Sequence, residues 1–110
     1  VFKMKGEEEH IAVVAKDVES QFEALRVALG AVLEDHKSDL YILDHKVDFE
    51  YMKKICDDCP EDFEDNLEFL TDMGGKLYSN VKENEKYNFT ILSTEEIIEK
   101  LKEYNIIVPF

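Results

Sequence analysis

Both cysteines of this 110-residue chain lie in one short stretch, KKICDDCPED. Cys56 and Cys59 have the C-x-x-C spacing, which is found in dithiol redox sites and also supplies half of the ligands of a structural zinc site. A reversible disulfide, a persulfide-carrying site and a metal site are therefore open readings. A metal site would need further ligands, from a second copy of the motif across a dimer or from the histidines His10, His36 and His45.

The charges around the cysteines bear on their reactivity. Cys59 precedes Pro60, a residue favoured at the first position of a helix, and the positive end of a helix lowers a thiol pKa. Four carboxylates surround the pair, and negative charge disfavours the reactive thiolate; they are Asp57, Asp58, Glu61 and Asp62. The pair is thus expected to be a poor nucleophile unless the fold turns the acids away. Two reduced, partly buried thiols are the default expectation for a chain without a signal peptide.

The composition excludes several kinds of partner. Twenty-six acidic residues against 13 basic ones give a formal charge of −13, which repels nucleic acid and anionic lipid. No apolar run approaches the roughly 18 residues that span a membrane. We therefore expect one cytoplasmic domain over residues 1–110, with neither nucleic acid nor membrane as a partner.

Apolar residues predict alternating strands and helices along the whole chain. Strands are expected over 10–16, 39–44, 76–81, 89–93 and 106–108, helices over 19–35, 60–75 and 93–104, and a short helical segment within 45–59. This order requires crossover connections, so it predicts an α/β fold with a mostly parallel five-stranded sheet covered by helices on both faces. Residues 82–88 are expected to form a polar loop.

Helical spacing also predicts which side chains are buried. The predicted core residues are Phe22, Leu25, Ala28, Leu29, Val32 and Leu33 in the first helix, Val47, Tyr51 and Ile55 in the short segment, and Phe63, Leu67, Phe69 and Leu70 in the next helix. Ser93 and Glu96 have the spacing of a capping box, which marks the start of the last helix. Pro109 limits the last strand to an edge or an end of the sheet.

Ligands of open parallel sheets bind beyond the carboxyl ends of the strands. Polar side chains at these ends are candidate groove residues, with His45 as a candidate base; they are His45, Ser79, Asn80, Ser93 and Thr94. The long connection that carries the cysteines leaves from the same edge. Neither a glycine-rich phosphate loop nor a G-x-S-x-G elbow is present, so no nucleotide or other cofactor is expected, and no metal is assigned.

Three segments resemble the DsrE/DsrF-like family of small sulfur-relay proteins: EALRVALGAVLEDHKSDLYILD, NLEFLTDMGGKLYSN and FTILSTEEIIEKLKEYNIIVPF. The resemblance implies a flavodoxin-like three-layer sandwich and assembly into homo-oligomers or with related subunits. It also implies a sulfur-carrying cysteine at the end of the third strand. That position falls at Asn80, or at Ser79 if the register slips by one, and neither residue can carry a persulfide.

The expected function is therefore that of a non-catalytic or partner subunit linked to sulfur relay. The alternatives are a thiol-active redox or persulfide-carrying protein that uses Cys56 and Cys59, with these as its catalytic residues, and a C-x-x-C metal-binding protein.

Overall fold

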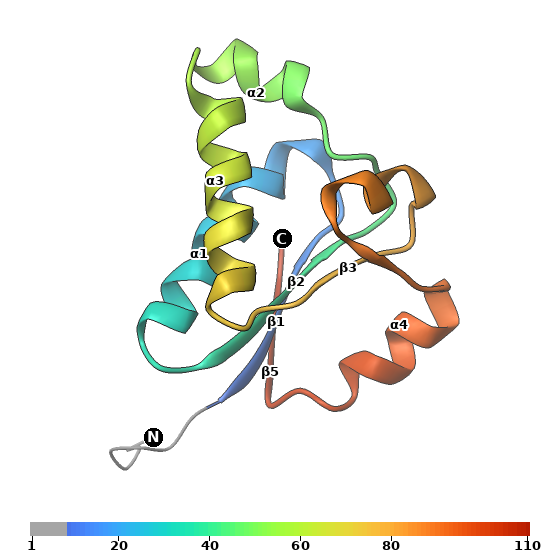
Figure 1. The fold of residues 1–110 in the computed structure, drawn as a ribbon. Helices are drawn as coiled ribbons and strands as arrows, with labels where there is room; N and C mark the ends of the chain where they lie inside the picture. Colours follow the sequence, from blue (N-terminus) through green and yellow to red (C-terminus); the bar gives the residue numbers. More distant parts are fainter. Residues whose placement is uncertain (1–8) are drawn as a thin grey trace.

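The computed structural model describes residues 9–110 as alternating strands and helices (Figure 1). The strands are β1 (His10–Ala15), β2 (Lys37–Ile42), β3 (Leu77–Ser79), β4 (Thr90–Ile91) and β5 (Ile106–Pro109). The α-helices are α1 (Gln21–Leu33), α2 (Phe49–Ile55), α3 (Cys59–Asp72) and α4 (Thr94–Leu101), with short 3-10 helices η1 (Val18–Ser20) and η2 (Lys82–Tyr87). The polar loop expected over 82–88 is thus mostly the 3-10 turn η2.

The five strands form one all-parallel sheet in the order β4-β3-β2-β1-β5. Helices α1 and α3 pack side by side on one face, and α4 lies on the other (Figure 1). The chain moves outward from β1 to β4, then returns through α4 to place β5 beside β1. The expected fold class is confirmed: a single α/β domain built as a flavodoxin-like three-layer sandwich.

Two apolar clusters, one on each face of the sheet, hold the layers together. The larger one packs the alternate strand residues Val13, Leu40 and Ile42 against Leu25 of α1 and Phe63 of α3. The smaller one lies under α4 and joins Tyr41, Tyr78 and Ile97 to apolar residues of β1. Successive strand residues point to opposite faces, so continuous apolar runs such as IAVVA fit strands buried on both sides.

Several local predictions are confirmed. Ser93 and Glu96 form the reciprocal bonds of a capping box at the start of α4. These hydrogen bonds from Ser93 hold the pKa of the Glu96 carboxyl below its usual value. Pro109 lies in β5, which is an edge strand.

Three residues predicted to be in the core are exposed instead. The exposed fractions of Leu33 and Ile55 are 59% and 60%, and that of Phe69 is 47%. The apolar side of each helix extends further than the part that a neighbouring element covers. Leu33 and Ile55 are the last residues of α1 and α2, and Phe69 lies at the side of the buried face of α3. In α2 the buried position is taken by Met52.

Candidate functional site

The predicted groove residues Asn80 and Thr94 meet at the carboxyl edge of the sheet. Asp44 and Asn80 bond reciprocally, because the Asp44 N–H donates to Asn80 Oδ1 (2.8 Å) and Asn80 Nδ2 donates to Asp44 Oδ1 (2.9 Å). The same amide nitrogen donates to Thr94 Oγ1 at 3.3 Å. Asp44 adopts a left-handed φ of 68°, which aspartate tolerates better than most residues. The ends of β2 and β3 are thereby tied to the start of α4.

These three residues border a cavity of about 370 Å³, here called the rim cavity. Its remaining lining is mostly apolar and comes from β1, β2, α4 and β5: Val14, Lys16, Leu43, Ile97, Ile98, Leu101, Ile107 and Pro109. A cavity of this size with an apolar wall and a few polar groups has the usual make-up of a binding pocket. Its polar groups are amide, hydroxyl, carboxylate and ammonium, and none of them is a thiol or an imidazole.

Ser79 and Ser93 serve the scaffold next to the rim cavity and do not line it. Ser79 is fully buried, and its Oγ accepts hydrogen bonds from the Val81 N–H (3.1 Å) and from Asn84 Nδ2 (3.0 Å). Ser93 is occupied with capping α4. Of the two positions to which the family resemblance assigns sulfur, one is therefore a buried hydroxyl and the other the hydrogen-bonded amide of Asn80.

His45 lies on the connection after β2 and does not line the rim cavity. Its Nδ1 lies 3.1 Å from the Lys46 carbonyl oxygen. Because a carbonyl only accepts, Nδ1 carries the proton, and Nε2 is left as a buried acceptor with no hydrogen-bond partner among residues 9–110. The structure does not bring this candidate base together with Asn80 and Thr94.

Asn84 is a residue of this region that the sequence did not indicate. Its side chain is fully buried, accepts from the Val47 N–H (2.8 Å) and donates to the His45 carbonyl (3.1 Å). Together with its bond to Ser79, these contacts fix the connection after β2 to the end of β3. It lies in a polar, glycine-free stretch without apolar periodicity, so no pattern marks it as buried.

Cys56 and Cys59 are joined by a disulfide at the junction of α2 and α3. This differs from the default expectation of reduced thiols, because the turn between the two helices brings the Cα atoms to 5.3 Å, within the range that a disulfide spans. Cys56 is exposed, whereas Cys59 is buried in the first turn of α3. Neither residue lines the rim cavity, so the long connection carries the sulfurs away from Asn80.

The oxidised pair also bears on the metal alternative, because disulfide sulfurs are not thiolate ligands. Within residues 9–110, no group of three or more histidine, cysteine, aspartate or glutamate side chains is arranged to hold a metal ion. In the same part of the chain, no helix has the length and apolar character needed to cross a membrane.

Comparison with known proteins does not add a family. No model of a protein family matches the chain, and no curated protein matches it either. The resemblance to DsrE/DsrF-like proteins therefore stays a prediction.

Proposed function

We propose that this chain is a non-catalytic DsrE/DsrF-like subunit that assembles with a second copy or a related subunit in sulfur relay. One observation carries this proposal. The position at which the resemblance implies a persulfide holds Asn80, whose amide is bound to Asp44 and Thr94. The lining of the rim cavity can thus hold a partner group by shape and hydrogen bonds, but it includes no thiol that could carry sulfur.

The lining of the rim cavity, between α4 and β5, is a part of the α4 face with few charges, whereas the outer side of α4 carries the exposed residues Glu95, Glu96 and Glu99. Across the whole chain 35% of residues are charged, whereas the rim cavity has only Lys16 and Asp44, which are of opposite sign. Two copies with a charge of −13 each can approach only where like charge is sparse, and interface cores are depleted of charged residues.

Helices cover the two faces of the sheet unequally, which supports the same face as the interface. Two long helices, α1 and α3, cover one side, but α4 alone covers the other. Ile98 of α4 and Ile107 of β5 are 53% and 46% exposed, and both line the rim cavity. Pro109 lacks a backbone N–H, so pairing along the free edge of β5 is weakened, which leaves the apolar face as the better contact.

A matched pair of variants tests this proposal. Ile107 and Ile106 are neighbours in β5 with similar exposure, but the strand register places Ile107 on the α4 face and Ile106 on the opposite one. We expect light scattering to give a multiple of 12.8 kDa for the wild type. Ile107→Glu should give the monomer, and Ile106→Glu should behave like the wild type. A wild type that stays monomeric at high concentration would refute assembly with a second copy.

The disulfide favours a second candidate, a dithiol–disulfide couple. A thiolate of a dithiol reductant would attack the exposed Cys56 Sγ and release Cys59 as thiolate in the first turn of α3. The second thiol of the reductant then resolves the mixed disulfide, so that two electrons and two protons pass to the cysteines and the reductant becomes a disulfide. The acidic residues of the turn oppose formation of the Cys59 thiolate.

Reduction followed by alkylation separates the two candidates. A redox couple predicts complete reduction by one equivalent of a thioredoxin-type dithiol protein, and a variant of that protein without its resolving cysteine should be trapped as a mixed disulfide on Cys56. If the sulfurs resist that protein and yield only to excess small-molecule reductant, the bond is structural. The assembly of the Cys56→Ser/Cys59→Ser variant, measured in parallel, is expected to match the wild type.

A further inference from the structure

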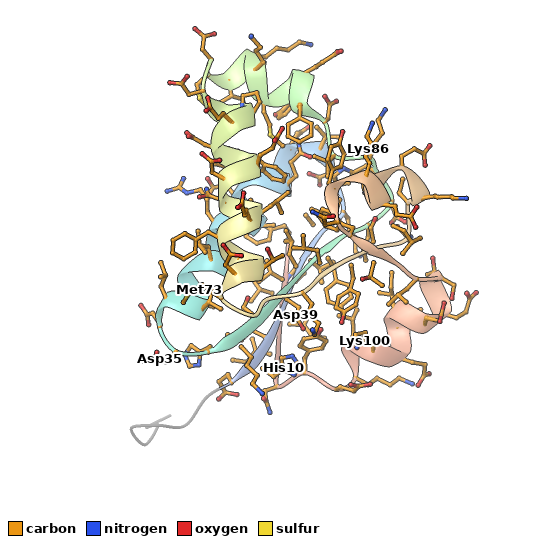
Figure 2. All side chains as sticks on the ribbon, in the orientation of Figure 1. His10, Asp35, Asp39, Met73, Lys86 and Lys100 are labelled. Carbon is orange, nitrogen blue, oxygen red and sulfur yellow. A yellow bond between two sulfur atoms is a disulfide. The ribbon has the colours of Figure 1, made fainter. Side chains whose placement is uncertain are left out.

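A second cavity lies at the opposite, amino edge of the sheet, where the strands begin. Its volume is about 600 Å³, within the range of small-molecule sites. Figure 2 shows His10, Asp39 and Lys100 at this end of the sheet, with Asp35 and Met73 beside them, just past the ends of α1 and α3. The rim cavity and this amino-edge cavity share no residue.

Asp39 fixes the walls of the amino-edge cavity. Its buried carboxylate accepts from the Lys76 N–H (2.9 Å) and the Tyr104 hydroxyl (2.6 Å), and lies 3.2 Å from His10 Nε2. Burial, together with the bond to Asp39, raises the pKa of Tyr104 and keeps its hydroxyl protonated as a donor. Tyr41 then donates to the Tyr104 oxygen at 2.8 Å. These bonds join β1, the turn before β3 and the segment before β5.

Basic side chains gather around this cavity despite the acidity of the chain. Three of the 13 basic residues line it, against two of the 26 acidic ones; the basic residues are Lys37, Lys76 and Lys100. Two of the three histidines line it as well. His36 Nδ1 accepts from the Glu9 N–H (3.1 Å), so the ring proton lies on Nε2, which is a donor. The Asp39 carboxylate already accepts hydrogen bonds from protein donors. Most of the other polar groups that line the cavity are therefore cations or hydrogen-bond donors.

Ser38 borders the same cavity from the other side of the sheet, on the face covered by α1 and α3. Its side chain is 1% exposed and lines the cavity, and its Oγ has no hydrogen-bond partner within residues 9–110. The Tyr78 ring provides apolar surface on the α4 face, with the Lys100 ammonium 5.0 Å from the ring centroid, whereas Val32 lies with Ser38 on the face covered by α1 and α3.

We propose that the amino-edge cavity binds a small organic phosphate, with the phosphate held by Lys76 and Lys100 and a ring-shaped body against Tyr78. Lysine ammonium groups bind phosphate as point charges, and a doubly charged head group suits several of them at once. The apolar wall is what separates this site from one that binds a bare ion.

The probes for the test are phenyl phosphate, inorganic phosphate and phenol, titrated into the full chain by calorimetry in a phosphate-free buffer. We expect saturable binding of phenyl phosphate that weakens as salt rises from about 0.05 M to about 0.5 M. Inorganic phosphate should bind more weakly, and phenol should not bind measurably. Amide NMR signals of residues 36–39 and 73–78 should shift on addition of phenyl phosphate.

Two sets of variants locate the site. Lys76→Gln/Lys100→Gln should weaken phenyl phosphate by about tenfold or more, whereas Lys53→Gln/Lys54→Gln on α2, with the same change in net charge, should leave affinity unchanged. Absence of saturable binding, equal loss in the two lysine pairs, or phenol binding as tightly as phenyl phosphate would overturn the proposal. If inorganic phosphate bound as tightly as phenyl phosphate, the claim that the ligand is an organic phosphate would be refuted.

Discussion

Replacing Asn84 by alanine should test whether one buried amide fixes the connections around the rim. The change leaves two backbone groups without a hydrogen-bond partner, the Val47 N–H and the His45 carbonyl. It also removes the N–H group that donates to Ser79 Oγ. Each buried group left without a partner costs about 1–3 kcal/mol, so the two together predict a loss of about 2–6 kcal/mol in the free energy of unfolding. That is a large share of the roughly 5–15 kcal/mol of a typical domain.

Urea unfolding followed by circular dichroism measures this loss as a lower transition midpoint at unchanged slope. Asn66→Ala is the matched control, because Asn66 lies on α3 with no side-chain hydrogen bond recorded among the described residues, and it should change stability by less than about 0.5 kcal/mol. Asn84→Asp keeps an oxygen that accepts from the Val47 N–H. It also places a second oxygen against the His45 carbonyl, where Asn84 Nδ2 donates a hydrogen bond. Its folded-state pKa would be raised, so its cost should grow as pH rises above about 4. A loss below about 1 kcal/mol for Asn84→Ala would refute the reasoning.

Three further outcomes test the scaffold. Gly75→Ala would put a Cβ 2.7 Å from the Leu70 side chain and should cost about 1–3 kcal/mol in urea unfolding; wild-type stability would contradict the close approach. Ser93→Ala removes a capping box and should cost about 0.5–2 kcal/mol, seen as a lower melting temperature, and an unchanged melt would argue against the cap. Burial raises the pKa of Tyr41 to about 12, so its stabilising effect is complete below the unfolded-state value of about 10 and is lost as pH rises toward 12. Tyrosinate absorbance should show two late-titrating groups, Tyr41 and Tyr104, of which Tyr41→Phe removes one, and ordinary titration of every tyrosine would refute it.

The alternation of strands and helices was readable from the sequence because each apolar run is short and bounded by polar residues. HIAVVA became β1, and the capping box of Ser93 located the start of α4. Helical spacing identified Phe63, Leu67 and Leu70 as buried residues of α3. It failed for Phe69, because periodicity shows which face of a helix is apolar but not how much of that face a neighbour covers.

The candidate site was predictable only where a general rule of topology applies. Parallel strands end at one edge, and this places Asn80 and Thr94 together without knowledge of the strand order. No such rule predicts which side chains, far apart in the sequence, form hydrogen bonds with each other. Asp39 and Tyr104 are 65 residues apart, and their hydrogen bond depends on β5 returning to lie beside β1. The disulfide likewise depends on the angle of the turn between α2 and α3.

Hydrogen exchange at low and high protein concentration tests most directly whether the face of α4 and β5 is an interface. We predict that peptides covering residues 94–101 and 105–110 gain protection as concentration rises, while those from α1 and α3 exchange at constant rates. Exchange that is independent of concentration over α4 and β5, or protection gained on the α1 and α3 side instead, would contradict the account.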